Sequence, residues 1–165
     1  MKTVVILVAI LTLAALPAFA QMEQGDREVQ AAGSIYTVED FTLINIVGTY
    51  GYYYRHNVQI GVGPSITRIE VFGFSETTLG ASFFGRYFFP SKTKTVPYLV
   101  AQWYQFDFSP PDPLSFTDAS YLQGGAGFKY FVNEYIAWDV SANLGFGLGG
   151  GSVALLIVGG VSAFF

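Results

Sequence analysis

Residues 136–148, IAWDVSANLGFGL, alternate along their whole length between two kinds of side chain. The odd-numbered positions hold small or polar residues, among them Asp139 and Asn143. The even-numbered positions are all apolar: Ile136, Trp138, Val140, Ala142, Leu144, Phe146 and Leu148. Because successive side chains of a β-strand point to opposite faces, this pattern predicts a strand with one apolar face and one polar face.

The same period of two recurs through the chain. It is clear in residues 57–66, 77–89 and 122–132, and weaker in residues 27–36, 43–54, 96–106 and 153–165. The face assignment of residues 96–106 stays open, because Gln102 and Gln105 fall on opposite sides. Together with residues 136–148, these segments predict eight strands.

The composition says what covers this protein. Of its 165 residues, 52% are hydrophobic and only 12% are charged, and the mean hydropathy is +0.42. Such a composition excludes a disordered chain. It also indicates that much of the folded protein's surface faces something other than water. The net charge of −4 argues against nucleic acid as a partner. The absence of cysteine excludes disulfides, thiolate metal sites and a cysteine nucleophile.

Two other architectures compete with a membrane barrel. Residues 140–165 carry no charge and could span a bilayer as a helix, but seven of these 26 residues are glycine, which favours two strands joined at residues 149–151. A soluble barrel of the lipocalin type would show many Lys and Glu residues on its outer face. The polar faces here are mostly Gly, Ser, Asn and Gln, which suit a narrow lumen better than a wetted surface.

The connections between the predicted strands alternate in length. Those at residues 55–57, 90–95 and 133–134 are short, whereas those at 38–42, 67–76, 109–120 and 149–152 lie at the other end and include the long ones. Aromatic residues near the strand ends predict two girdles at the membrane interfaces: Tyr52, Tyr53, Tyr54, Tyr87, Phe88, Phe89, Tyr98, Tyr130, Phe131 and Tyr135 at the short turns, and Tyr36, Phe41, Phe72, Phe74, Phe106, Phe108 and Tyr121 at the loops. We therefore predict an all-β fold, an eight-stranded antiparallel transmembrane β-barrel with up-and-down meander topology.

The N-terminus has the features of a secretory signal peptide. Lys2 precedes an apolar segment, residues 4–16, and residues 18–20 (AFA) form a small-x-small cleavage site. We expect residues 1–20 to be removed after Ala20, which leaves residues 21–165 as the barrel domain.

Three segments resemble the small outer-membrane β-barrel domain family, the eight-stranded barrels of the OmpA/OmpX type. They are residues 85–90 (GRYFFP) leading to Pro97 and Tyr98, residues 125–131 (GAGFKYF) and residues 158–165 (VGGVSAFF). Phe165, which closes the last alternating strand, is similar to the C-terminal signal read by the outer-membrane assembly machinery. The resemblance implies that machinery as a transient partner. It also implies a Gram-negative outer membrane, with its lipids and lipopolysaccharide, as the location.

The alternation predicts which polar side chains enter the lumen. Glu28, Arg86, Lys129 and Asp139 point inward, together with Gln30, Gln59, Gln123 and Asn143. Two interpretations remain open: an ion-pair network that plugs the lumen, which we favour, or a gate in which Arg86 or Lys129 exchanges partners.

The sequence offers little for catalysis. Its single histidine, His56, lies in a predicted short turn on the periplasmic side, the wrong end for a lipid-A-modifying Ser–His pair. There is no phosphate-binding glycine loop among the motifs, and we predict no metal site, no cofactor and no enzymatic activity.

The extracellular loops are the remaining place for function. This end is acidic, with only Arg68 opposing seven carboxylates: Glu39, Asp40, Glu70, Glu76, Asp107, Asp112 and Asp118. Leu114 and Phe116, among prolines in residues 109–120, mark a possible contact loop. We predict a monomeric barrel that contributes to envelope structure or surface interaction. The alternative is a small porin-like channel for ions or small solutes.

Overall fold

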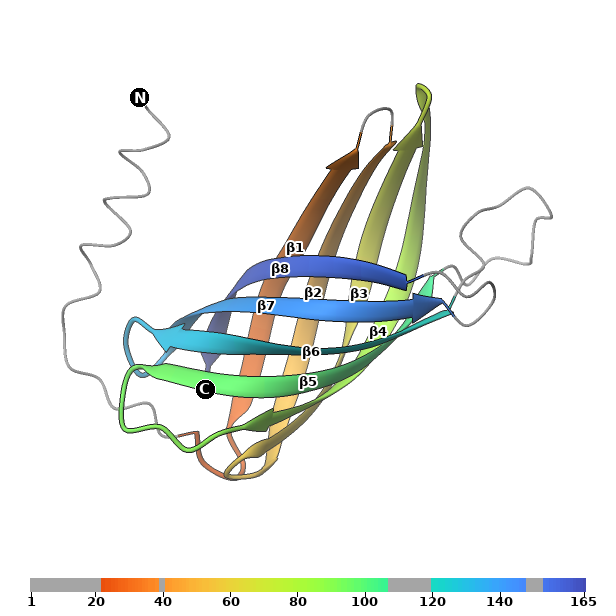
Figure 1. The fold of residues 1–165 in the computed structure, drawn as a ribbon. Helices are drawn as coiled ribbons and strands as arrows, with labels where there is room; N and C mark the ends of the chain where they lie inside the picture. Colours follow the sequence, from red (N-terminus) through yellow and green to blue (C-terminus); the bar gives the residue numbers. More distant parts are fainter. Residues whose placement is uncertain (1–21, 39–40, 107–119, 148–152) are drawn as a thin grey trace, which may run out of the picture.

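The structure is a computed structural model that describes residues 22–38, 41–106, 120–147 and 153–165. It contains eight strands (Figure 1): β1 (Arg27–Val38), β2 (Phe41–Arg55), β3 (Val58–Val71), β4 (Phe74–Phe88), β5 (Thr95–Phe106), β6 (Ser120–Phe131), β7 (Ile136–Gly147) and β8 (Val153–Phe164). The predicted signal peptide, residues 1–20, lies outside the described residues.

The strands form one closed barrel in chain order. Each strand pairs antiparallel with the next, and β1 pairs with β8 to close the sheet. The predicted eight-stranded meander is therefore confirmed. The helical alternative for residues 140–165 is wrong, because this segment contains the end of β7 and all of β8. Among the described residues, no helix is long and apolar enough to cross a membrane.

Burial alternates along the strands as the sequence pattern predicts. Ile35, Leu79 and Ile157 point outward and are more than 60% exposed, whereas Glu28 and Lys129 are buried in the lumen. A lipocalin-type barrel would have the reverse polarity, with apolar side chains inside throughout. In β5 the even positions face inward, since Tyr98 and Gln102 are buried and Trp103 is exposed, which settles the open face assignment.

The two ends of the barrel differ. We call the end with residues 56–57, 89–94 and 132–135 the short-turn end, and the opposite end the loop end. At the loop end, β3 and β4 continue to a two-residue turn at Phe72 and Gly73, whose φ angles are 49° and 82°. Positive φ at both central positions is characteristic of a tight hairpin turn. The expectation of a long loop at residues 67–76 is wrong, because ladder pairing continues to Val71 and Phe74.

Within the described residues, β1 to β4 extend farther toward the loop end than β5 to β8 do. Pairing of β1 with β8 ends at Gly33 and Gly159, and the described pairing of β4 with β5 ends at Gly80 and Phe106. Beyond these points β1, β2, β3 and β4 continue as an open four-stranded sheet, seen at the top of Figure 1. We call this part the projecting sheet; it comprises residues 34–38, 41–45, 67–71 and 74–79.

Candidate functional site

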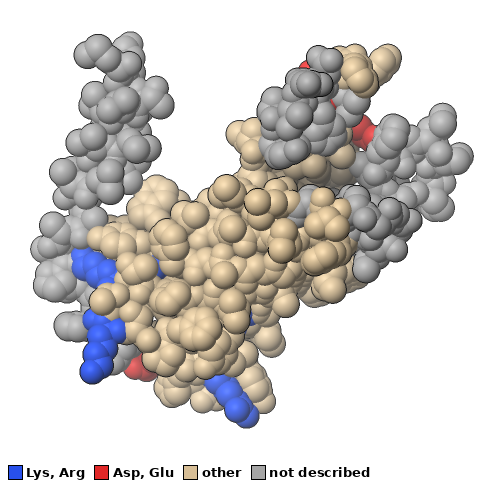
Figure 2. Space-filling model, in the orientation of Figure 1, with Lys and Arg blue, Asp and Glu red and all other residues tan. Residues whose placement is uncertain are grey.

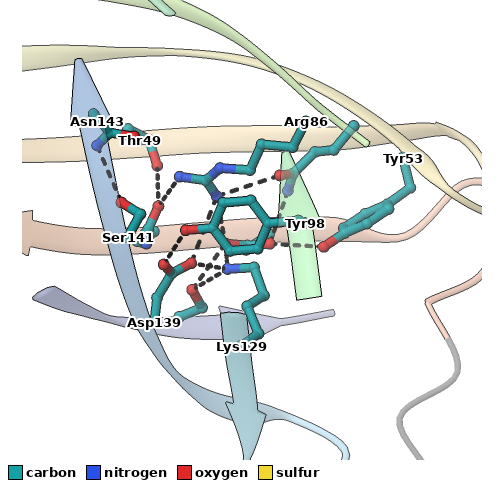
Figure 3. Close-up of polar contacts among 12 residues, drawn as sticks. Thr49, Tyr53, Arg86, Tyr98, Lys129, Asp139, Ser141 and Asn143 are labelled. Carbon is teal, nitrogen blue, oxygen red and sulfur yellow. Dashed lines mark hydrogen bonds and ion pairs between the residues drawn. The ribbon is translucent and has the colours of Figure 1, made fainter. Parts of the chain in front are cut away.

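Four charged side chains from different strands meet in the lumen. Glu28 comes from β1. Arg86 comes from β4, Lys129 from β6 and Asp139 from β7 (Figure 3). None is more than 8% exposed. Each stands on the inward face of its strand, so closure of the barrel brings together residues that are up to 111 positions apart.

Glu28 is the centre of this charge network. Its Oε1 accepts hydrogen bonds from Lys129 Nζ at 2.7 Å and from Ser162 Oγ at 2.8 Å. Its Oε2 accepts from the Tyr53 hydroxyl at 2.9 Å and from Gln59 Nε2 at 2.8 Å. A buried carboxylate loses its hydration shell, and these four donors replace it.

Lys129 joins the two carboxylates. Its Nζ lies 2.6 Å from Asp139 Oδ2 and also donates to Ser162 Oγ at 2.8 Å, so all three ammonium hydrogens have an acceptor. Lys129 and Asp139 are direct partners in the β6–β7 register. Tyr98 donates its hydroxyl hydrogen to Asp139 Oδ1. The pairing therefore follows from strand register together with the shared inward face.

Arg86 covers the network on the side of the loop end. Its guanidinium donates to Gln30 Oε1 at 2.7 Å and lies 3.5 Å from Glu28 Oε1 and 3.9 Å from Asp139 Oδ2. The guanidinium carbon also lies 4.5 Å from the centre of the Phe84 ring. Two cations thus balance two anions, which is the condition for keeping charges in a narrow lumen.

An aromatic layer fills the lumen between this network and the short-turn end. The ring centres of Tyr53 and Phe88 are 5.5 Å apart, and those of Phe131 and Phe164 are 5.1 Å apart. These four rings belong to a buried hydrophobic cluster that continues toward the loop end past Arg86 and also includes Phe84, Val96, Tyr98, Val100 and Ala137, with Met22 packed against it. The predicted girdle at the short turns is therefore wrong in part. Tyr53, Phe88, Tyr98 and Phe131 point into the lumen, because aromatic residues occupy both faces of these strand ends.

On the loop-end side of Arg86, the side chains fill the lumen less completely. A cavity of about 20 Å³ is lined by Arg86, Asn143, Ala32, Val158 and other residues, which is room for about one water molecule. Arg86 Nε and Asn143 Oδ1 are buried there without a hydrogen-bond partner. Outside this cavity, one buried polar atom each of Ser65, Thr78 and Gln123 also lacks a hydrogen-bond partner. Buried groups of this kind are normally satisfied by water.

The structure brings together most of the predicted lumen residues. Gln30 and Gln59 join the four charges directly, whereas Gln123 and Asn143 face the lumen away from the ion pairs. The sequence pattern does not predict that Tyr53, Tyr98 and Ser162 are hydrogen-bond partners of the charges. The face of Tyr98 was ambiguous, and the other two lie in segments of weak alternation.

The remaining predicted residues lie elsewhere. Phe165 is 64% exposed and its backbone pairs with Arg27, whereas the preceding Phe164 enters the aromatic layer. Leu114 and Phe116, the possible contact loop, lie outside the described residues, as do Glu39, Asp40, Asp107, Asp112 and Asp118 of the acidic end.

His56 lines a hollow of about 300 Å³ at the short-turn end, together with Glu23 and Ser91. These are residue types used in hydrolytic triads, but Ser91 Oγ donates to the Thr95 carbonyl at 2.8 Å. No hydrogen bond joins His56 to Ser91 or Glu23 in the described part of the chain. In the same residues, no group of three or more His, Asp and Glu side chains is arranged to hold a metal ion.

Solved structures of other proteins share the overall fold of this chain. The N-terminal β-barrel domain of Pseudomonas aeruginosa OprF superimposes with a TM-score of 0.63, over 86% of this chain and 98% of that domain, at 19% sequence identity. The chain has the fold of the small outer-membrane β-barrels. The Yersinia pestis outer membrane protein Ail, solved in a phospholipid bilayer nanodisc, matches over 86% of this chain and 99% of its own, with a TM-score of 0.52 and 12% identity. No protein-family model matches the sequence, and no curated protein sequence is similar to it.

The outer wall of this outer-membrane barrel fold is apolar over the height of the closed barrel. Rows of paired strand residues such as Ile46–Ile66–Leu79 and Tyr50–Val62–Phe83 face outward. On the same face, the next outward positions of β3 and β4 toward the loop end are Arg68 and Thr77. Figure 2 shows Lys and Arg side chains gathered toward the short-turn end, with a broad uncharged surface above them. Such a wall fits the hydrocarbon core of a bilayer.

Proposed function

We propose that this protein is a non-enzymatic barrel of the outer membrane that contributes to envelope structure and contacts other surfaces through its loop end. The fold and the apolar wall support the location. The paired charges support a structural role for the lumen, because a neutral network stabilises a packed barrel without moving a solute. We expect lipids and lipopolysaccharide around the wall and the assembly machinery as a transient partner.

The observation that carries the contact function is the projecting sheet. Strand β4 runs from Gly80, its last described pair with β5, to Phe74 at the hairpin, a distance of about 20 Å at ~3.3 Å per residue. Beyond Gly33, β1 has no paired strand on its β8 side within the described chain. An open sheet edge presents unpaired backbone groups, and such edges are common docking places for other chains.

The test removes the hairpin and leaves the barrel intact. Residues 68–77 are replaced by Asn-Gly, a two-residue turn that joins the paired residues Thr67 and Thr78 in the same register. Cells carrying the wild-type protein, the shortened variant or no protein are compared for attachment to protein-coated surfaces and to one another. We expect attachment to fall well below the wild-type level, because the variant loses the hairpin and the end of β4 and keeps only the open edge of β1. SDS-resistant folded barrel should remain at wild-type levels.

Attachment that is equal in all three strains would leave the contact function without support. Sensitivity of the cells to detergent is measured in parallel. Sensitivity that appears only when the whole barrel is removed would assign envelope structure to the barrel itself. Only together with equal attachment in all three strains would it leave envelope structure as the sole role.

A porin-like channel is the second candidate, and the unpartnered atoms on the loop-end side of Arg86 favour it. Water bound to those atoms would form the outer part of a path. The aromatic layer opposes it, since Phe88 and Ala137 are at most 1% exposed and leave no path onward to the short-turn end. Conduction therefore remains the alternative function, and single-channel recording in planar bilayers tests it.

A further inference from the structure

The tip of the projecting sheet carries two aromatic side chains that face water. Phe72 is 77% exposed and Phe74 is 84% exposed, and they flank Gly73 at the apex of the β3–β4 hairpin. This apex is the far end of the molecule at the top of Figure 1. Outward positions below it on both strands, Arg68 and Ser75, are polar, so the tip lies beyond the lipid-facing wall. Bulky apolar side chains at such a place commonly mark contact sites.

Phe72 is held in a conformation that disfavours it. Its φ of 49° lies in the left-handed region, where a bulky side chain is a rare outlier. Hairpin turns of this kind are usually formed by Asn-Gly or Asp-Gly. A ring that is three-quarters exposed regains little of this cost by packing within the chain. Strain that the free protein does not offset points to a role outside the fold.

The charges around the tip restrict what can cover it. Glu70 and Glu76 lie on either side of the turn, and Arg68 Nη2 is 3.9 Å from Glu70 Oε2. In the sequence, the other segments of the loop end add five carboxylates and no cation. A surface that binds the tip therefore needs cationic groups around an apolar centre.

A second copy of the chain fits this requirement poorly. It would bring the same acidic charge and the same convex tip. Among the hollows lined by described residues, one lies at the short-turn end, one on the lipid-facing wall around Val62 and Pro64, and one inside the lumen. None of these three is presented to the tip by a facing copy. A bilayer with anionic headgroups would repel the two carboxylates.

From these observations we propose that Phe72 and Phe74 form an aromatic anchor that inserts into an apolar cavity with a cationic rim on a partner protein. This proposal rests on the proposed contact function and specifies the chemistry of the partner's binding surface. Aromatic residues that fill pockets supply much of the affinity of protein interfaces, and the flanking carboxylates select for the cationic rim.

The first test uses a small molecule with the expected chemistry. Amino-substituted β-cyclodextrin has an apolar cavity that admits a phenyl ring and a rim of ammonium groups. It is titrated into the full-length protein in phosphatidylcholine nanodiscs, where lipid covers the barrel wall, and binding is followed by calorimetry. We expect binding about tenfold tighter than that of neutral β-cyclodextrin, and no measurable binding of the carboxymethyl form.

The variants locate the site. F72N/F74S removes both rings and places Asn, which tolerates positive φ, at position 72, so the hairpin is preserved. We expect this variant to lose binding, and E70Q/E76Q to bind the amino and neutral forms equally. Tyr135→Ser is the matched control, because Tyr135 is 59% exposed at the short-turn end. Unchanged binding by F72N/F74S, or loss by Tyr135→Ser, would overturn the anchor.

The second test uses cells and separates this inference from the proposed function. Attachment of cells carrying F72N/F74S is compared with that of the variant lacking residues 68–77. If both variants lose attachment, the anchor is supported. If only the shortened variant loses it, the contact function stands and the anchor is wrong. If neither loses it, both are wrong. Phosphatidylcholine vesicles that bind wild-type protein but not F72N/F74S would identify a bilayer, rather than a protein cavity, as the occupant.

Discussion

At the scale of single residues, the lumen shows how buried charges are tolerated. The single carboxylate of Glu28 accepts hydrogen bonds from Lys129, Ser162, Tyr53 and Gln59. Removing water from two isolated ions is costly, and only a complete set of partners offsets the cost. The network is therefore sensitive to the loss of any one charge.

Arg86→Ala tests this sensitivity. The substitution leaves two carboxylates and one ammonium in the lumen, and Gln30 loses its donor at 2.7 Å. Breaking a buried pair typically costs about 3–5 kcal/mol, so we expect a clear fall in the urea midpoint of unfolding in lipid. Arg68→Ala, which removes an exposed cation, is the control. Equal midpoints for Arg86→Ala and the wild type would contradict a stabilising network.

Glycines on the inward face make room for large lumen side chains. A Cβ atom at Gly127 would lie 2.6 Å from the Tyr98 ring and 2.6 Å from the Val140 carbonyl oxygen, whereas a Cβ at Gly124, on the outward face of the same strand, meets nothing within 4 Å. The small residues of the polar face thus serve the packing of neighbouring rings as well as the narrowness of the lumen.

Gly127→Ala is expected to destabilise the barrel by about 1–3 kcal/mol, because Tyr98 must move away from Asp139 to accept the added methyl group. Gly124→Ala on the same strand should change the urea midpoint little. The near-ultraviolet circular dichroism of the tyrosines gives a second readout of a displaced Tyr98. Similar effects of the two variants would show that the face of β6 is misassigned.

At the scale of elements, β3 and β4 serve two environments. Their outward residues up to Ile66 and Leu79 are apolar, and those beyond, such as Arg68 and Thr77, are polar. The strands continue without interruption across this boundary because the ladder needs only backbone pairing, which both environments permit. The boundary marks where the lipid-facing wall ends.

Lysine substitutions measure this boundary. Val62, in the middle of the wall, and Thr77, in the projecting sheet, both point outward. We expect Val62→Lys to lower the free energy of unfolding in lipid by about 2–4 kcal/mol, and Thr77→Lys to change it by less than about 1 kcal/mol. An equally small cost at both positions would mean that Val62 does not face hydrocarbon.

At the scale of the whole molecule, closure of the barrel gives it one measurable signature. All eight strands are paired on both sides over the closed part, so detergent finds no open edge there. In an isolated outer-membrane fraction we expect the unheated protein to migrate differently from the boiled protein in SDS gels. A protein absent from that fraction, or without a heat-dependent shift, would contradict the membrane barrel.

The aromatic layer predicts that the intact barrel does not conduct. In planar bilayers we expect no current steps from the refolded protein, because Phe88, Phe131 and Phe164 pack across the lumen near the short-turn end. The variant F88A/F131A opens this layer and serves as the comparison. Regular steps from the wild-type protein would favour the porin-like alternative over a plugged lumen.

The sequence alone determined the fold and the chemistry of each face. A period of two, repeated eight times with an apolar side and a polar side, is a local property of the chain, which is why it predicted the barrel and placed Glu28, Arg86, Lys129 and Asp139 in one lumen. It failed where both faces carry similar residues. At the short-turn end, aromatic residues occupy adjacent positions, so hydrophobicity does not distinguish the two faces. At residues 67–76, polar side chains suggested a loop, although the pairing of β3 with β4 continues there.

Only the tertiary structure decided which residues meet. Three features depend on register around the closed sheet: the contacts of Glu28 with Tyr53 and Ser162, the division of the aromatic residues between wall and lumen, and the extension of β1–β4 beyond the described ends of β5–β8. Register is a property of pairs of strands. It is fixed when the barrel closes and side chains compete for the lumen, so a pattern read along one strand does not contain it.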